Sequence, residues 1–254
     1  MKKYFVIGNP IDHSLSPKLH NFWMKKDNII SVYDKKKLEE KDIKSVINEI
    51  KIGRIAGLNV TVPFKKKVIP YLDKLSQEAE KTQSVNTILL KNNTIVGHNT
   101  DIEGFINAFK SLNFDLYGKK IFILGAGGVV SSIIFALNKM GASDIMVSNR
   151  TRKKAEDLKL QFSHIKIEDW GNISEFDVII NATSLGLKNE DINLDFSKVG
   201  NGKLFYDVIY NPIETNFLKK GKELGNRTEN GGLMFIYQAA QAYELWHGFK
   251  PEIN

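Results

Sequence analysis

Two side chains in the first half of the chain could move a proton to or from a substrate. Lys65 follows Pro63-Phe64, and Asp101 ends the segment Asn99-Thr100-Asp101. An ammonium group beside a carboxylate can protonate an oxygen that gains negative charge during a reaction. Two plainer interpretations stay open, because Lys65 could be one exposed lysine of three and Asp101 could cap a following helix. The separation of the two residues in sequence says nothing about their distance in space.

Short polar clusters stand at the ends of expected strands in the same part of the chain. They are Ser14-Leu15-Ser16, Asn59-Val60-Thr61, Asn86-Thr87 and Asn99-Thr100-Asp101. Hydroxyls, amides and one carboxylate at one sheet edge would suit a small polyhydroxylated ligand. Each cluster also has a structural alternative: Ser16 is expected to cap a helix that has Pro17 at its first position, and Asn86 could form a turn.

A glycine turn in the second half predicts a site for pyrophosphate. Residues 121–128 read IFILGAGG, a strand followed by the turn Gly125, Ala126, Gly127 and Gly128. Free N–H groups at the start of the next helix attract phosphate. In such sites the first glycine permits the tight turn, and the second lets the phosphate approach the backbone. Taken alone, a glycine turn after a strand could be structural.

Basic residues follow the next expected strand, at the place where NAD-binding proteins usually carry an acid. The segment reads Asn149, Arg150, Thr151, Arg152, Lys153 and Lys154. A carboxylate would repel a ribose 2′-phosphate, whereas a guanidinium group can hold one through two hydrogen bonds. The sequence therefore predicts NADP rather than NAD. A solvated basic helix start is the alternative, and the helix dipole disfavours it.

Alternating strands and helices must position these groups, which predicts an α/β fold with two open, mostly parallel sheets. In the first part we expect strands over 4–7, 30–33 and 55–60, helices over 17–25, 39–50 and 64–82, and a hairpin of 86–90 and 94–96 around Asn92-Asn93. In the second part we expect a helix over 102–112, further strands over 178–180 and 204–208, and a long last helix over 234–246. Asn181-Ala182-Thr183-Ser184, after one of these strands, would line the cofactor crevice, although the segment could also be only an N-cap or a turn.

Composition excludes several classes of site. The net charge is +7, but the lysines are spread along the chain without an arginine-rich stripe, so nucleic acid is not expected as a partner. The absence of cysteine excludes disulfides and thiolate chemistry, and the five histidines lack the spacing of metal ligands. No signal peptide or membrane span is recognised, so we expect a soluble cytoplasmic protein.

In their order along the chain, the motifs resemble the shikimate dehydrogenase family. They are GNPIDHSLSP, NVTVPFK, SVNTI, GHNTD, GAGG, NRT, NATSLG, DVIYNP and MFIYQAA, and they cover nearly the whole chain. The resemblance implies an oxidoreductase that carries out the reversible, NADPH-dependent reduction of 3-dehydroshikimate to shikimate. This reaction is a step toward chorismate and the aromatic amino acids.

The resemblance also implies roles for individual residues. Lys65 and Asp101 would be the catalytic pair. The substrate would be bound by Ser14, Ser16, Thr61, Asn86, Tyr210 and Gln238. NADP would be bound by Gly125, Ala126, Gly127, Gly128, Asn149, Arg150, Thr151, Lys154, Thr183, Ile209 and Gly232. No metal is implied.

The same resemblance implies a domain arrangement. A substrate-binding and catalytic domain would span 1–101 and be completed by 233–254. A Rossmann-like NADP-binding domain would span 102–232, with a cleft between the two. The protein would be a monomer or a homodimer.

Two departures and two other functions stay open. Val129 and Val130 stand where the family usually has small residues, and Leu233 replaces a glycine next to the expected nicotinamide pocket, which bears on Gly232. A quinate/shikimate dehydrogenase that uses NAD(P) is one alternative, which the basic cluster after Arg150 disfavours where NAD is concerned. A non-catalytic NADP-sensing protein is the other, although a sensor needs neither Lys65 nor Asp101.

Overall fold

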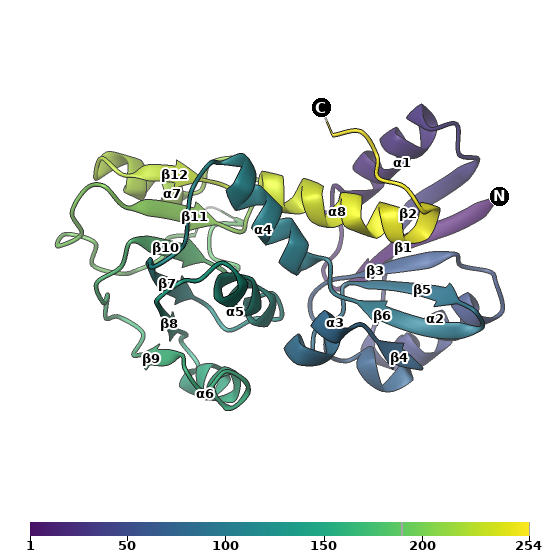
Figure 1. Cartoon of the computed structure of the whole chain (residues 1–254), viewed down its shortest axis with the longest axis horizontal. Coiled ribbons are helices and arrows are strands. Elements are labelled where there is room, and N and C mark those ends of the chain that lie inside the picture. The colour runs from purple at the N-terminus through teal and green to yellow at the C-terminus, as the bar shows by residue number, and fades with distance from the viewer. Residues whose placement is uncertain (189, 254) are drawn as a thin grey trace. The chain divides into compact units, whose positions relative to one another are not determined.

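The chain divides into two compact units in the computed structural model, which describes residues 1–188 and 190–253. Unit 1 comprises Met1–Gly104 and Ile236–Asn254, and unit 2 comprises Phe105–Phe235. The divisions fall within two helices, α4 (Asp101–Ser111) and α8 (Gly232–His247). Each unit is an α/β structure with one open sheet, as the sequence predicts (Figure 1).

Unit 1 contains a mixed six-stranded sheet whose order is β2-β1-β3-β5-β6-β4. Its strands are β1 (Lys2–Gly8), β2 (Ser31–Lys37), β3 (Gly57–Val60), β4 (Lys74–Leu75), β5 (Thr87–Lys91) and β6 (Thr94–His98). Its other helical segments are α1 (Ser16–Lys26), η1 (Glu40–Asp42), α2 (Ile43–Lys51), η2 (Ile69–Tyr71) and α3 (Gln77–Thr82). β1 runs parallel to β2 and β3, whereas β5 is antiparallel to β3 and β6.

Local sequence explains two of these elements directly. The four isoleucine and valine residues of α2 recur at helical spacing, and all of them are buried. The β5–β6 turn places Asn92 and Asn93 at φ values of 50° and 58°. Two successive positive φ values give the turn twist that a two-residue hairpin needs, and asparagine tolerates this conformation better than most residues.

The register of this sheet brings its polar segments to one edge. Asn59 in β3 pairs with Thr87 in β5, and Thr87 pairs with His98 in β6. Ile7 in β1 pairs with Val60 in the parallel strand β3. The loops that leave β1, β3 and β6 and the loop that enters β5 therefore emerge at the same edge of the sheet.

The C-terminal helix α8 packs against this sheet through its aromatic side chains. A Cβ at Gly57 would come within 2.3 Å of Trp246 Nε1, so only glycine allows this approach. Trp246 Nε1 donates to the Ile88 carbonyl at 3.3 Å, and the Tyr243 hydroxyl donates to Asp27 at 2.6 Å. Residues from Ile236 onward thus share the core of unit 1, although they are the last in sequence.

Unit 2 contains a sheet in which every strand pair is parallel, with the order β12-β11-β10-β7-β8-β9 (Figure 1). The strands are β7 (Lys120–Leu124), β8 (Asp144–Ser148), β9 (Lys166–Glu168), β10 (Val178–Asn181), β11 (Leu204–Asp207) and β12 (Arg227–Glu229). The helices between them are α5 (Val130–Lys139), α6 (Arg152–Gln161) and α7 (Asn216–Glu223). Counted from β7, this is the dinucleotide-binding order 3-2-1-4-5-6, which reverses between β7 and β10.

The structure corrects two local predictions. Residues 64–76 are not α-helical: they form turns, the short 3₁₀ helix η2 and β4, and only α3 is an α-helix in the stretch 64–82. Pro70 lacks the N–H that a continuous helix would need, and the Lys65 carbonyl accepts from Val85 N at 2.9 Å instead of from a helical turn. Ser16 is also not an N-cap. α1 includes Ser16 as its first residue, Leu15 holds the cap position, and no side chain caps the helix.

The described helices were also compared with the requirements of a membrane span. None of those within residues 1–188 and 190–253 is both long enough and apolar enough to cross a bilayer.

Candidate active site

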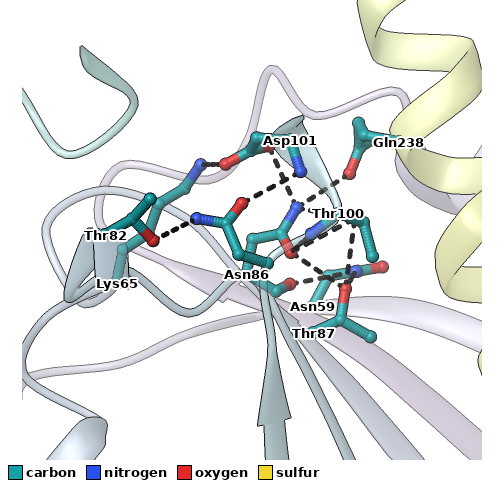
Figure 2. A network of polar contacts seen from close by, with 9 residues as sticks. Asn59, Lys65, Thr82, Asn86, Thr87, Thr100, Asp101 and Gln238 are labelled. Atoms are coloured by element: carbon teal, nitrogen blue, oxygen red, sulfur yellow. Dashed lines mark hydrogen bonds and ion pairs between the residues drawn. The ribbon is translucent and has the colours of Figure 1, made fainter. Parts of the chain in front are cut away.

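Lys65 and Asp101 form a buried ion pair at the polar edge of the sheet in unit 1. Lys65 Nζ lies 2.5 Å from Asp101 Oδ2, and the side chains are only 10% and 8% exposed (Figure 2). A charged pair that is largely removed from water interacts far more strongly than a surface pair. The plainer interpretation of Lys65 as an exposed lysine is therefore wrong.

Two different loops bring this pair together. Lys65 follows β3, and its carbonyl is bound by Val85 just before β5. Its neighbours Phe64 and Val68 are buried in the core of unit 1, which anchors the turn on both sides of the lysine. Asp101 is the first residue of α4, where a negative charge is favoured by the helix dipole.

Asn86 links the ion pair to the rest of the polar edge. Its Oδ1 accepts from Thr100 N at 2.7 Å, so its Nδ2 must face the other way. That Nδ2 donates to Asp101 Oδ1 at 2.9 Å and reaches Gln238 Oε1 at 3.3 Å (Figure 2). One amide therefore holds the carboxylate of Asp101 and touches a side chain from α8.

A second layer of hydrogen bonds fixes Asn86 from below. Asn59 Nδ2 donates to Thr87 Oγ1 at 3.0 Å and to the Asn86 carbonyl at 3.1 Å, while Tyr33 donates to Asn59 Oδ1 at 2.6 Å. Tyr33 in turn stacks on His20, with ring centroids 4.3 Å apart. Burial lowers the pKa of His20 to about 3, and repulsion from His247 adds to this effect. His20 is therefore neutral at physiological pH.

The remaining predicted substrate residues of unit 1 lie after β1 and β3. Ser14 lies in the loop after β1, Ser16 is the first residue of α1, and Ser14 Oγ accepts from Ser16 N at 3.4 Å. Thr61 leaves β3, and a Cβ at Gly8 would come within 2.6 Å of its methyl group, which places the two loops in contact. The structure thus gathers five of the six predicted substrate residues in unit 1. Tyr210 lies in unit 2, where it stacks on Phe235 with centroids 4.3 Å apart.

The glycine turn after β7 has the geometry that a pyrophosphate needs. Gly125 adopts a φ of +113°, and a Cβ there would come within 2.7 Å of the Ala182 carbonyl oxygen. A Cβ at Gly127 would meet nothing within 4 Å, so the backbone faces open space. The N-cap residue of α5, Val129, makes no side-chain capping bond, and Val130 N donates to the Gly127 carbonyl at 3.0 Å. The positive end of the helix dipole at this point favours a phosphate.

The basic residues after β8 divide into two groups. Arg152 is engaged by Glu156 at 3.2 Å and by Asp169, and Lys153 pairs with Asp157. Within the described part of the chain, Arg150 and Lys154 have no acidic partner, and both are exposed at the start of α6. Asn149 Nδ2 donates to the Thr151 carbonyl at 2.8 Å and so braces this turn. Arg150 and Lys154 are therefore the basic side chains of this segment that could accept a 2′-phosphate without breaking an ion pair.

The last three predicted cofactor residues lie on loops at the carboxyl edge of the same sheet or next to it. Thr183 follows β10, and Ile209 follows β11. Gly232 is the first residue of α8, and its N–H donates to Asn230 Oδ1 at 2.9 Å. The glycine that packing requires is its neighbour Gly231, because a Cβ there would come within 2.1 Å of the Val208 carbonyl oxygen.

One buried acid in unit 2 was not among the predicted site residues. Asp207, the last residue of β11, is fully buried and bound to Asn181, Ile209 and Thr215. Burial raises the pKa of its carboxyl to about 6, an increase that these hydrogen bonds partly oppose. An acid directly after the apolar run Leu204–Tyr206 was the sequence signal that could have identified it.

Comparisons with known proteins point to one family. Residues 6–88 match the model of the shikimate dehydrogenase substrate-binding domain, and residues 107–195 match that of shikimate/quinate 5-dehydrogenase. An NADP(+) shikimate dehydrogenase of Pelagibacter ubique is 56% identical over 100% of this chain and 97% of its own length. One of Caldanaerobacter subterraneus is 39% identical over 97% of this chain and 92% of its own.

A solved structure gives the same result for the fold. Shikimate 5-dehydrogenase of Thermus thermophilus, in complex with NADP(H) and shikimate, has a TM-score of 0.91 and 30% identity, and the match covers 99% of this chain and 95% of that one. The resemblance recognised from the motifs is confirmed by these comparisons. The chain belongs to the shikimate dehydrogenase family.

Proposed function

We propose that this chain catalyses the reversible, NADPH-dependent reduction of 3-dehydroshikimate to shikimate, with Lys65 and Asp101 as its catalytic pair. The chain belongs to a family of NADP-dependent oxidoreductases, which supports the reaction and the cofactor. The observation that carries the assignment of residues is the buried contact of 2.5 Å between Lys65 Nζ and Asp101 Oδ2.

The pair supplies the proton that the reaction requires. When bound, the reduced nicotinamide provides a hydride, which no side chain can supply. The ketone oxygen of the substrate then gains negative charge, and Lys65 gives it a proton to complete the alcohol. Asp101 holds Nζ in place and stabilises its positive charge. In the reverse direction, the neutral amine of Lys65 accepts the hydroxyl proton as the hydride leaves.

The polar edge of unit 1 is proposed to bind the substrate. The hydroxyls of Ser14, Ser16 and Thr61 and the amides of Asn86 and Gln238 can each donate or accept hydrogen bonds, which suits a ring with several hydroxyls. Asn86 and Gln238 already contact each other at 3.3 Å, so a ligand hydroxyl could join both. Tyr210 is proposed as a further substrate contact from unit 2.

Unit 2 is proposed to bind NADP. The turn from Gly125 to Gly128 and the start of α5 fit the pyrophosphate, and Arg150 and Lys154 fit the 2′-phosphate together with Asn149 and Thr151. Thr183, Ile209 and Gly232 are proposed to contact the nicotinamide half. The assignment of substrate to unit 1 and cofactor to unit 2, with a cleft between them, is part of this proposal.

Three further properties concern where the protein acts and in what assembly. The family's reaction uses small water-soluble molecules, so we propose that the chain acts in the cytoplasm. We also propose that it works as a monomer or homodimer and without nucleic acid, because no arginine-rich stripe accompanies its net charge.

A spectrophotometric assay tests the proposed reaction. Purified protein is mixed with shikimate and NADP⁺, and the absorbance of reduced nicotinamide is followed. We expect a signal with this pair and a much weaker one when NAD⁺ replaces NADP⁺. Absence of signal with shikimate and NADP⁺ would refute the proposed reaction. Equal rates with both nucleotides would refute the role of Arg150 and Lys154. A parallel assay with quinate tests the alternative of a quinate/shikimate dehydrogenase.

A further inference from the structure

Asp207 is a fully buried carboxylate held only by uncharged donors. It accepts from Ile209 N at 2.9 Å, from Thr215 Oγ1 at 2.6 Å, and from Asn181 Nδ2 at 3.1 and 3.2 Å. None of the ion pairs found among residues 1–188 and 190–253 involves it. Burying an acid without a cation is costly, so this group calls for an explanation beyond packing.

The first of its contacts sets the loop that follows β10. A carboxylate can only accept hydrogen bonds, so it fixes the amino end of the Asn181 amide toward itself. Asn181 Oδ1 must then face its own loop, where it accepts from Thr183 Oγ1 at 2.7 Å and from Thr183 N at 3.1 Å. The orientation of Thr183, a proposed cofactor contact, thus depends on Asp207 through one side chain.

The same loop presses against the glycine turn after β7. Gly125 has no room for a Cβ because the Ala182 carbonyl oxygen would lie only 2.7 Å away. Ala182 lies between Asn181 and Thr183. The loop that Asp207 holds in place is therefore the same loop that packs against Gly125 in the glycine turn.

The second contact sets the segment that follows β11. Ile209 N donates to Asp207 Oδ1, and the Ile209 carbonyl accepts from Gly231 N at 3.1 Å. Asp207 therefore holds Ile209 directly, and through the Ile209 carbonyl it holds Gly231, which leads into α8. The third contact, Thr215, points elsewhere, because Thr215 is the N-cap of α7 and also accepts from Leu218 N.

We propose that Asp207 is a positioning residue for NADP: its carboxylate locks the loop after β10 and the segment after β11 into one arrangement at the point where the strand order reverses. This proposal rests on the proposed binding of NADP by unit 2. In this proposal Asp207 is not itself a cofactor contact and acts through Asn181 and Ile209. We call the contacts of Asp207 with Asn181 and Ile209 the relay. The Asp207–Thr215 bond holds the start of α7 and is not part of the relay.

Two variants of the same carboxylate network separate positioning from stability. Asp207→Asn keeps the shape of the side chain but turns an acceptor into a donor that faces Asn181 or Ile209. Thr215→Val removes the hydroxyl on the α7 side and leaves both relay contacts in place. The affinity of each folded variant for NADPH is measured by titration of the nucleotide's fluorescence, and the thermal midpoint and the KM for shikimate are measured in parallel.

We expect Asp207→Asn to weaken NADPH binding about tenfold, the scale of one lost hydrogen bond to a charged group. The KM for shikimate should stay near the wild-type value. Thr215→Val should lower the thermal midpoint but change NADPH affinity by less than about twofold. Should Asp207→Asn fail to fold, Asn181→Ser removes the relay and keeps Asp207, and it should weaken NADPH binding in the same way.

Two results would overturn the proposal. One is NADPH affinity unchanged in Asp207→Asn, or in Asn181→Ser where that variant is used, with only the thermal midpoint lowered. The other is an equal loss of affinity in Thr215→Val. Failure of the proposed function looks different, because the unaltered protein would then bind NADPH but reduce no NADP⁺ with shikimate. The binding titration does not depend on turnover, so the two failures can be told apart.

Discussion

The proposed sites of the two units consist of different kinds of group. In unit 1 the site consists of side chains that satisfy one another: Lys65, Asp101 and Asn86 are buried and mutually bonded before any ligand arrives. In unit 2 the proposed cofactor site consists of bare backbone at Gly127 and exposed cations at Arg150 and Lys154. A small hydroxylated ring needs a few fixed partners, whereas a large polyanion is held by N–H groups and positive charge.

The buried acids of the two units show the same contrast. Asp101 faces a lysine at 2.5 Å, in the pair proposed to exchange a proton with the substrate. The bonds described for Asp207 come from neutral donors, and burial raises the pKa of its carboxyl to about 6. We therefore propose a catalytic role for the acid paired with a cation and a positioning role for the acid bound to amide and hydroxyl groups.

The largest expected effect concerns the unit 1 pair. Lys65→Ala should lower kcat by about 10² to 10⁴-fold, the range for loss of an acid–base group, while NADPH still binds. Steady-state kinetics and a nucleotide titration measure the two quantities. Lys66→Ala is the matched control, because this neighbouring lysine is exposed and should leave kcat unchanged. Turnover retained in Lys65→Ala would mean that unit 1 is only a binding surface.

The next effect concerns the response of the two units to acid. The pKa of His20 falls from 6.5 to about 3 on folding, so below pH 6.5 the unfolded chain binds a proton that the folded chain does not. The free energy of unfolding should therefore fall by about 1.4 kcal/mol per pH unit, or about 2 kcal/mol between pH 6.5 and 5. Asp207 acts with the opposite sign, since its raised pKa makes its burial costly as the pH rises from 3.8 to about 6.

Denaturant titrations of wild type and His20→Phe at pH 7 and pH 5 measure this response. The aromatic replacement keeps a ring against Tyr33 and removes the titrating group, so the variant should lose less stability on acidification than wild type. Identical losses in the two proteins would show that the neutral imidazole does not govern the acid response of unit 1.

A smaller effect separates the basic residues of unit 2. Arg150→Ala should raise the KM for NADP about tenfold and leave the KM for NAD nearly unchanged, because only NADP carries the 2′-phosphate. Arg152→Ala is the control, since that guanidinium group is already engaged by Glu156 and Asp169. A loss of the same size in both variants would point to the overall positive charge of α6 and away from a specific phosphate clamp.

The smallest effect concerns the link between Gln238 and Asn86. Gln238→Ala should raise the KM for shikimate several-fold, the scale of one neutral hydrogen bond, with little change in NADPH affinity. A loss of NADPH affinity with an unchanged KM for shikimate would mean that Gln238 contacts the cofactor. The proposed assignment of substrate to unit 1 and cofactor to unit 2 would then be wrong for this residue. Both constants come from the same kinetic and binding series.

Much of the fold could be predicted because its signals are local. A few neighbouring residues are enough to predict the structure at three places: the isoleucines of α2, the Asn92-Asn93 turn and the glycines after β7. The helix predicted over 64–82 was wrong in its first part, 64–76, because the interactions that decide the structure there are not local. Its charged, apparently helical pattern is overridden by Pro70 and by the tertiary bond from Val85 to the Lys65 carbonyl.

The site residues could be named from motifs, but their contacts could not. Nothing in the sequence shows that Lys65 meets Asp101, because a turn after β3 and the start of α4 approach each other only once the sheet has formed. Arg152 is ion-paired with Asp169, a residue outside the motif, so the motif alone does not show that Arg152 is engaged while Arg150 lacks an acidic partner among the described residues. Asp207 belongs to the motif DVIYNP, but the motif does not reveal that this acid is buried without a cation from the part of the chain that the structure describes.

The proposed hydride transfer can be followed through one hydrogen atom of shikimate. Shikimate that carries deuterium on the carbon of the oxidised hydroxyl is incubated with the protein and NADP⁺, and the reduced nucleotide is examined by mass spectrometry. Transfer of a hydride to the nucleotide and of a separate proton to Lys65 predicts that the deuterium is recovered in NADPH. Recovery of the deuterium in water, or no reduced nucleotide at all, would contradict the proposed reaction.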